Sequence, residues 1–166
     1  MWFKKVFVEL LIVICFLVAS EFMLNMPAEA ITQDFQWVGS AGYMMKGTFS
    51  YEEAKDREII AEQGIGAANR LNSLTVTFYS PSGDAIARYE DVVKGDIEKE
   101  FFEFNFNTTT QKAIGDIDLG GEQLGELFLR GTVGNSLSLV KIEPSGKEHI
   151  LDRSNQIEFF HPSTIE

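Results

Sequence analysis

The chain has 166 residues, of which 45% are hydrophobic and 23% charged, so it has the composition of one folded domain rather than of a disordered polypeptide. Its formal net charge of −11 argues against binding to nucleic acid and to anionic membrane surfaces, both of which require basic clusters. The acidity is explained by solubility alone, because charge of one sign keeps an exported domain from self-associating.

The first thirty residues have the pattern of a secretory leader. Lys4 and Lys5 precede an apolar stretch, Val6–Ala19, and small residues stand at Ala28 and Ala30, the two positions that a signal peptidase recognises. We therefore expect cleavage directly after the second alanine. The alternative is an uncleaved N-terminal membrane anchor, for which the apolar stretch is shorter than the ~20 residues that span a bilayer.

These features predict a signal peptide over residues 1–30 and a single domain over residues 31–166. The domain is expected to be secreted, in the periplasm or outside the cell, and detached from the membrane after cleavage. Cys15, the one cysteine of the chain, lies in the leader, so the mature domain contains no disulfide.

The first clear strand signal lies in residues 43–51. Tyr43, Met45, Phe49 and Tyr51 alternate with polar side chains, which is the period of a half-buried strand. Glycines at 39 and 42 indicate a turn before this strand, and Gly47 inside it indicates a bulge or a close approach of another group.

The next segment, residues 52–63, is rich in residues that tolerate a helix. Glu53 and Arg57 stand at i, i+4 spacing and Gly64 is a candidate cap, but few apolar residues form a stripe. We expect at most one short helix here, or an excursion over the surface.

Short alternating segments fill the rest of the chain. Leu74, Val76 and Phe78 are expected to face the core, as are Phe102, Phe104 and Phe106. Further strands are expected at residues 85–90, 114–119, 126–133, 137–142, 148–152 and 156–160, with a break at Gly120-Gly121. Eight or nine such strands separated by turns predict an all-β fold, an antiparallel β-sandwich of jelly-roll or immunoglobulin-like type.

Two of these segments share sequence. Asn72-Ser73-Leu74 followed by Pro81-Ser82-Gly83 recurs 63 positions later as Asn135-Ser136-Leu137 followed by Pro144-Ser145-Gly146. The pattern is explained either by a duplicated hairpin or by independent use of the same turn chemistry.

Three acidic residues form the candidate metal site. Asp116 and Asp118 share one face of a predicted strand, and Glu122 follows two glycines that would let backbone carbonyls approach. Such oxygens suit Ca²⁺, although EF-hand spacing is absent. The alternative is an edge strand with its carboxylates in water, in which case no cofactor is needed.

The candidate ligand-binding residues are aromatic. Trp37, Tyr43 and Tyr51 would offer flat faces to a sugar ring if they lay on the surface. The alternative is that they pack in the core, as large aromatic side chains usually do.

No group of residues commits the chain to catalysis, and its catalytic residues are unknown. His149 and His161 lack the sequence context of a metalloprotease or of a serine hydrolase. Two carboxylates for glycoside hydrolysis are available among the many acidic residues, but no pair is distinguished by spacing.

Three segments together resemble a family of exported cyanobacterial proteins. They are Phe35-x-Trp37-x-Gly39-x-x-Gly42-Tyr43-x-x-x-Gly47-x-Phe49-x-Tyr51, Leu71-x-Ser73-Leu74 leading to Phe78-Tyr79-x-Pro81, and Phe104-x-Phe106-x-Thr108-Thr109-Thr110. Several members carry a C-terminal Pro-Glu-Pro sorting tail, which is not found before Ile165-Glu166 here, so we do not expect sorting by such a tail. The resemblance implies export and a bacterial source, and it implies no activity.

The sequence thus favours a non-catalytic, exported or surface-associated module that binds a glycan or another exported protein. Two alternatives stay open. One is an extracellular polysaccharide hydrolase that uses paired carboxylates, and the other is a structural component of an extracellular matrix.

Overall fold

The computed structural model describes residues 30–52, 59–63, 71–92 and 100–160, which form twelve strands in two antiparallel sheets. The five-stranded sheet contains, in spatial order, β12 (Ile157–Phe160), β1 (Ala30–Val38), β2 (Met44–Glu52), β4 (Leu71–Tyr79) and β5 (Ala85–Val92). The seven-stranded sheet contains β11 (Glu148–Ser154), β10 (Ser136–Ile142), β9 (Leu127–Thr132), β8 (Asp116–Gly121), β6 (Glu100–Asn107) and β3 (Ile59–Gln63), with β7 (Lys112–Ala113) paired to β6. The predicted all-β class and antiparallel β-sandwich are confirmed.

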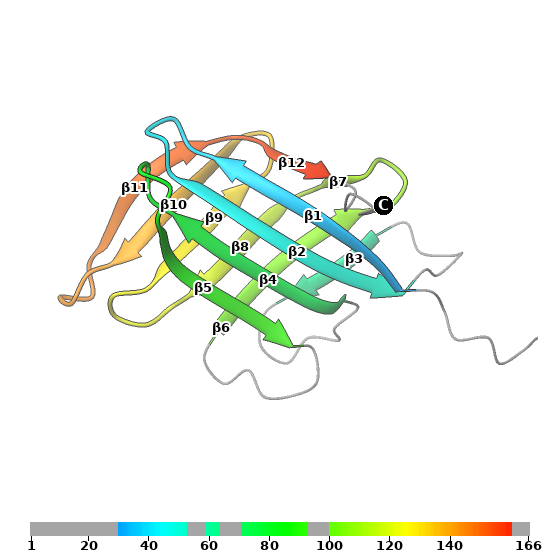
Figure 1. Ribbon diagram of the computed structural model, residues 1–166, viewed down its shortest axis with the longest axis horizontal. Helices are drawn as coiled ribbons and strands as arrows, with labels where there is room; N and C mark the ends of the chain where they lie inside the picture. Colours follow the sequence, from blue (N-terminus) through cyan, green and yellow to red (C-terminus); the bar gives the residue numbers. More distant parts are fainter. Residues whose placement is uncertain (1–29, 53–58, 64–70, 93–99, 161–166) are drawn as a thin grey trace, which may run out of the picture.

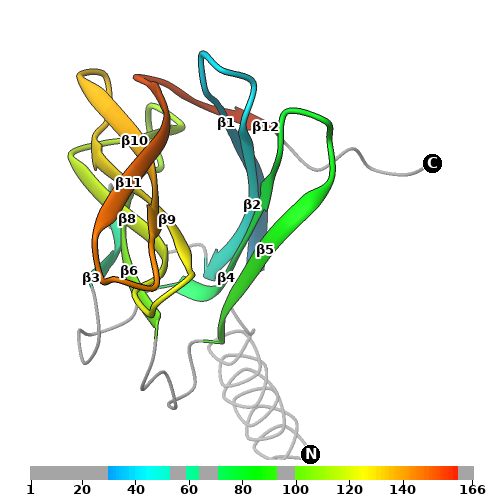
Figure 2. The ribbon, with the colours of Figure 1, turned by 90° about the vertical axis from the view of Figure 1, so that its left-hand side faces the viewer.

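The two sheets lie face to face as two layers, which Figure 2 shows edge-on. In Figure 1 the strands of the five-stranded sheet cross those of the seven-stranded sheet steeply, which is typical of an orthogonally packed sandwich. No hydrogen-bonded ladder between described strands joins one sheet to the other, so the layers meet through their side chains.

Aromatic rings fill the space between the layers, as the period of two predicts. Met45, Phe49 and Tyr51 of β2 are buried, and so are the three inward phenylalanines of β6. Ring centroids of Phe35 and Phe104, from opposite sheets, lie 5.2 Å apart, and those of Phe49 and Phe106 lie 4.9 Å apart. Such pairs stabilise the core beyond the effect of area burial alone, by about 0.5–1.5 kcal/mol each.

Residues 59–63, where at most one short helix or a surface excursion was expected, form β3 at the edge of the seven-stranded sheet. Ile59 lies opposite Asn107 and Ile60 opposite Phe106, and Ile60 is buried. β-Branched side chains suit a pleated surface, and pairing with the free edge of β6 outweighs the weak helical tendency of the segment. The other part of that expectation, residues 53–58, lies outside the described residues.

The predicted break at Gly120-Gly121 is also wrong, because β8 continues through both glycines. Gly120 has φ +139°, and a Cβ there would lie 2.3 Å from the carbonyl oxygen of Leu127. The glycine therefore permits a close approach of β8 and β9 within the sheet instead of ending the strand.

The two segments that share sequence form matching parts of the fold. Each is a hairpin, β4–β5 in one sheet and β10–β11 in the other, and each ends on an edge strand. Gly83 and Gly146 close the two turns with φ of +91° and +79°, which glycine adopts without strain.

The last change of sheet among the described strands occurs between β11 and β12. After β11 it turns at Asn155 and Gln156 and enters β12, which pairs with β1, the first described strand. Figure 1 shows this crossing at the top of the molecule, where β12 ends beside β7. The first and last described strands are thus neighbours, and three turns frame the space between β12 and β7.

Candidate functional site

The residues that were predicted to bind a sugar ring lie largely in the core. Trp37 and Tyr51 are 0% and 3% exposed, and Tyr43 is half-buried against the same core. A platform that uses Trp37 and Tyr51 would need both rings to leave the interior. The structure thus favours the alternative of core packing for these two side chains.

The carboxylates that were predicted to bind a metal lie on the outer face of the seven-stranded sheet. Asp116 and Asp118 share that face, and the Asp116 carboxylate accepts a hydrogen bond of 2.5 Å from the Thr132 hydroxyl. Glu122 is exposed in the loop that follows β8. The described residues contain no cluster of three or more His, Cys, Asp or Glu side chains arranged to hold a metal ion.

Asp118 has an unusual electrostatic environment. Its Oδ1 atom is buried and accepts no hydrogen bond from the described residues. Burial, together with the nearby Glu122 carboxylate, raises the pKa of Asp118 to about 7. Glu103 lies directly opposite on β6, so two carboxyl groups with different surroundings face each other across the strands.

Arg130 lies opposite Asp118 on β9, but it is engaged elsewhere. Its guanidinium donates to Glu148, with one of the two hydrogen bonds 3.0 Å long, and it lies 5.1 Å from the ring centroid of Phe128. This arrangement explains why the nearby cation lowers the pKa of Asp118 less than desolvation raises it.

Asp152, on β11, holds the corner of the sandwich together. Its carboxylate accepts hydrogen bonds from the backbone N–H groups of Ala41 and Tyr43 and from the Ser40 hydroxyl, at 2.9–3.2 Å. Burial alone would raise the pKa of Asp152, but these bonds and one from the Arg153 N–H outweigh it and lower the pKa. The described partners are groups of the protein itself, which points to a structural role.

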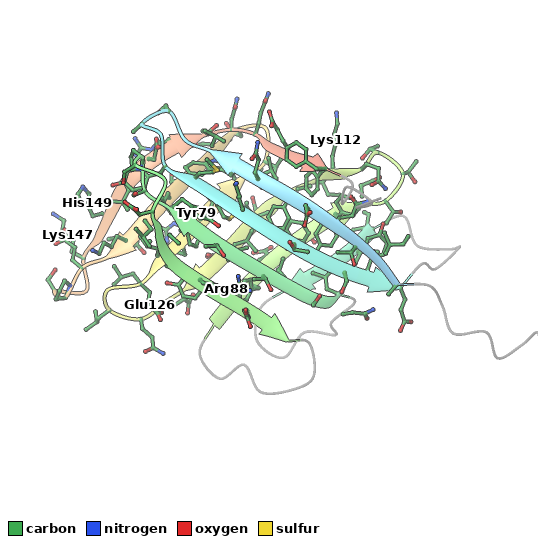
Figure 3. All side chains as sticks on the ribbon, viewed as in Figure 1. Tyr79, Arg88, Lys112, Glu126, Lys147 and His149 are labelled. Carbon is green, nitrogen blue, oxygen red and sulfur yellow. The ribbon has the colours of Figure 1, made fainter. Side chains whose placement is uncertain are left out.

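A groove of about 640 Å³ lies between β12 and β7, a volume within the ~300–1,000 Å³ that is usual for ligand pockets. Its polar lining comes from Gln111, Lys112, Asn155, Gln156 and Glu158, and its apolar lining from Ala113, Val133, Ile157, Phe159 and Phe160. Figure 3 shows Lys112, the first residue of β7, at the end of the molecule where β12 ends.

The walls of the groove are tied to the sandwich by backbone hydrogen bonds. The Gly134 N–H donates to the Asn155 carbonyl at 2.8 Å, which joins the turn after β9 to the turn after β11. The Val133 N–H donates to the Gly115 carbonyl at 2.9 Å. The groove is therefore formed before a ligand arrives, which lowers the entropy lost on binding.

Gln111 is the most constrained side chain in the lining. Its φ of +54° is the only left-handed value among the described residues other than glycine, and such values concentrate at functional sites. Its Oε1 accepts from the buried Gln33 amide at 2.9 Å, and its Nε2 donates to the Thr108 carbonyl at 2.6 Å. Each end of the amide keeps one further hydrogen-bonding position.

The apolar side of the groove continues into the core. Phe159 packs against Phe106 and Phe35, with ring centroids 5.1 and 5.8 Å away. Phe160, the next residue, points outward and is 44% exposed. A rigid apolar floor therefore ends at an exposed aromatic ring.

Sequence analysis did not identify any of these groove residues. The groove joins three turns and two strands, β7 and β12, from separate parts of the chain, and the left-handed backbone of Gln111 leaves no mark in the sequence. One signal was present, because alternation in Ile157–Phe160 places Phe160 on the outward face, where a polar residue is usual.

Comparison of the chain with known protein families, curated proteins and solved structures gave no match. Within the described part of the chain, no helix has the length and apolar character needed to cross a bilayer. The leader and the cleavage position Ala28 lie outside the described residues, and Ala30 is the first residue of β1. The fold and the groove together define the molecule as a two-layer β-sandwich with a preformed surface groove.

Proposed function

We propose that this protein is an exported, non-catalytic binding module that holds its ligand in the groove between β12 and β7. The observation that carries the proposal is the lining itself, which combines apolar rings with polar side chains, three of them primary amides. Small-molecule sites are commonly built in this way, with a few polar groups that fix the orientation of the ligand.

The composition of the groove supports binding rather than catalysis. Its lining includes one carboxylate, Glu158, and no histidine, cysteine or serine. Glycoside hydrolysis requires two carboxyl groups, and covalent catalysis requires an activated nucleophile with a base beside it. The Glu158 carboxylate already accepts a hydrogen bond from the Gln36 amide at 3.2 Å.

The proposal is tested by mapping ligand contacts onto the labelled protein by NMR. We expect a panel of glycans and peptides to contain compounds that shift backbone resonances of residues 111–113, 133–134 and 155–160. A binder that shifts only residues on the opposite edge, in β5, would contradict the placement of the site. So would a panel from which nothing binds.

A second function is favoured by one observation, the pairing of Glu103 with Asp118 on the outer face of the seven-stranded sheet. A carboxyl group with a pKa of about 7 opposite a second carboxyl group is the combination that general acid catalysis of glycoside hydrolysis uses. We propose a polysaccharide hydrolase at this pair as the alternative to the binding module.

The alternative is tested by the release of reducing ends from neutral and acidic polysaccharides between pH 5 and pH 8, a range around the pKa of about 7. If Asp118 is the acid, activity falls as pH rises past 7, and Asp118→Asn and Glu103→Gln each abolish it. Absence of released ends from the whole panel would remove this alternative and leave the binding module.

A further inference from the structure

We infer that the ligand of the groove is a neutral oligosaccharide, bound through the amides of Gln111, Asn155 and Gln156 and the exposed ring of Phe160. This inference rests on the proposed function and adds the class of ligand. It uses residues that are distinct from Trp37, Tyr43 and Tyr51, the aromatic residues that the sequence suggested.

The lining of the groove is rich in primary amides. Gln111, Asn155 and Gln156 supply three amides at one groove, and each combines a donor and an acceptor. Sugar hydroxyls are also donors and acceptors at once, so neighbouring hydroxyls and an amide satisfy each other in pairs. Hydrogen bonds of Gln111 to Gln33 and Thr108 fix one amide plane before binding, whereas Asn155 and Gln156 are exposed.

An apolar surface lies beside these amides in the groove. The C–H face of a pyranose ring is apolar and is best covered by a flat ring. Phe160 belongs to the groove lining and provides such a ring at 44% exposure. Aromatic side chains with one face open to solvent and polar groups within reach are typical of surfaces that contact amphipathic ligands.

The charges of the groove lining and of the whole chain favour a neutral ligand. Lys112 and Glu158 contribute one charge of each sign to the lining, while the whole chain carries a formal charge of −11. The surrounding field repels a polyanion, and no cluster of cations at the groove compensates for this repulsion. A ligand without charge pays no such cost, so we expect neutral sugars to bind better than uronate-containing ones.

The free edge of β12 is too short to favour a peptide over a sugar. A peptide that added to the free edge of β12 would pair with only four residues, Ile157–Phe160, before the chain turns away at Gln156. So short an edge offers few backbone hydrogen bonds, which are the source of affinity in strand addition. The fixed side-chain amide of Gln111 would contribute little to the addition of a peptide strand, which uses backbone hydrogen bonds.

The experiment uses the exported protein purified from an expressing bacterium. Short neutral oligosaccharides, oligogalacturonates and random short peptides are titrated calorimetrically against the wild type and two variants, Phe160→Ala and Asn155→Ala. The matched controls are Ile86→Ala, which removes an apolar side chain of 43% exposure from β5, and Asn72→Ala, which removes an exposed amide from β4.

We expect a neutral oligosaccharide to bind, each groove variant to raise its Kd roughly tenfold, and the controls to leave the Kd unchanged. Binding of peptides but not of sugars, sensitive to the same variants, would overturn the inference and leave the proposed function intact. Sugar binding that neither variant weakens would place the site elsewhere and overturn both. Preference for oligogalacturonates over neutral sugars would overturn the inference on charge.

Because Phe160 and Asn155 are exposed, the variants are expected to fold, and their circular dichroism spectra should match that of the wild type. A third variant, Gln111→Gly, removes the amide at a position where the left-handed backbone suits glycine. We expect it to weaken binding of the neutral oligosaccharide roughly tenfold as well, and an unchanged Kd would contradict the role of this amide.

Discussion

Two aspartates show how the same side chain acquires opposite properties from its surroundings. Asp152 accepts hydrogen bonds from backbone N–H groups and a hydroxyl, which hold its pKa below 3.8, the usual value. Burial is the main cause that raises the pKa of Asp118 to about 7; its buried oxygen accepts no hydrogen bond and other carboxylates lie nearby. Burial acts in the same direction on both groups, and only at Asp152 do enough donors reverse it.

Replacement of Asp152 by asparagine is expected to destabilise the fold. The amide keeps one acceptor oxygen but turns an NH₂ group toward backbone donors, so we expect a loss of about 2–3 kcal/mol at neutral pH. Because the folded pKa is depressed, the stabilisation is present above pH 4 and is lost as pH falls through the folded pKa.

Urea denaturation at pH 7 and at pH 3 measures this difference. The gap between the wild type and Asp152→Asn should shrink at the lower pH. Asp84→Asn, in an exposed turn, serves as the control and should change little. Equal stability of Asp152→Asn and the wild type at pH 7 would show that the corner does not depend on the charge.

Replacement of Asp118 by asparagine is expected to stabilise the protein at alkaline pH. The raised pKa means that the native state holds a proton between pH 4 and 7 that the unfolded state has released. Stability of the wild type therefore falls as pH rises through this window and is level above it. With solvent screening taken into account, we expect Asp118→Asn to be more stable at pH 8 by roughly 1–2 kcal/mol.

Melting temperatures of both proteins between pH 4 and pH 8 test this expectation. The variant should show a flatter dependence on pH across the window. A wild-type curve that rises from pH 4 to pH 7 in step with that of the variant would contradict the raised pKa of Asp118.

At the scale of the strand, alternation in the sequence predicted which residues face the core. The inward residues of β2, β4 and β6 were identified correctly because each strand has one buried and one solvated face. Segments without that contrast were missed. β3 has two adjacent isoleucines and no alternation, and β1 begins at Ala30, shortly after the apolar N-terminal stretch of the sequence.

Alternation could not predict the groove, because the groove depends on how separate strands and turns pack together. Gln111, Asn155 and Phe160 come from a turn, a corner and a strand that are brought together by the pairing of β12 with β1. Periodicity reports the environment of one segment at a time. It contains no information on which turns become neighbours after the chain has crossed from one sheet to the other.

Gly47 provides a test of strand-level packing. It was predicted to mark a bulge or a close approach, and the structure shows the latter, because a Cβ at this position would lie 2.2 Å from the ring of Phe35. Phe35 is 1% exposed and packs against Phe104, so its ring has little room to move. We expect Gly47→Ala to destabilise the protein by about 1–3 kcal/mol through overpacking.

The measurement is the midpoint of chemical denaturation. Lys46→Ala, at the exposed neighbouring position of the same strand, is the control and should leave the midpoint almost unchanged. A midpoint for Gly47→Ala equal to that of the control would mean that Phe35 relaxes without cost.

The whole molecule is expected to unfold as one unit, because both sheets contribute to a single aromatic core. Trp37 is fully buried in that core and is the only tryptophan of residues 31–166, so its fluorescence in a protein limited to these residues reports on the core. Fluorescence and far-UV circular dichroism should give the same thermal midpoint. Two separate midpoints would show that the sheets unfold independently.

The pairing of β12 with β1 has a consequence for how the chain acquires its shape during synthesis. Phe35 and Phe159 are partners in this ladder, so β1 leaves the ribosome long before the strand with which it pairs. Contacts between such distant segments form slowly, and an unpaired edge invites association with other chains in the meantime. A nascent chain that lacks the final strand would accordingly leave β1 open on one side, and premature termination there would favour aggregates over a slightly shortened domain.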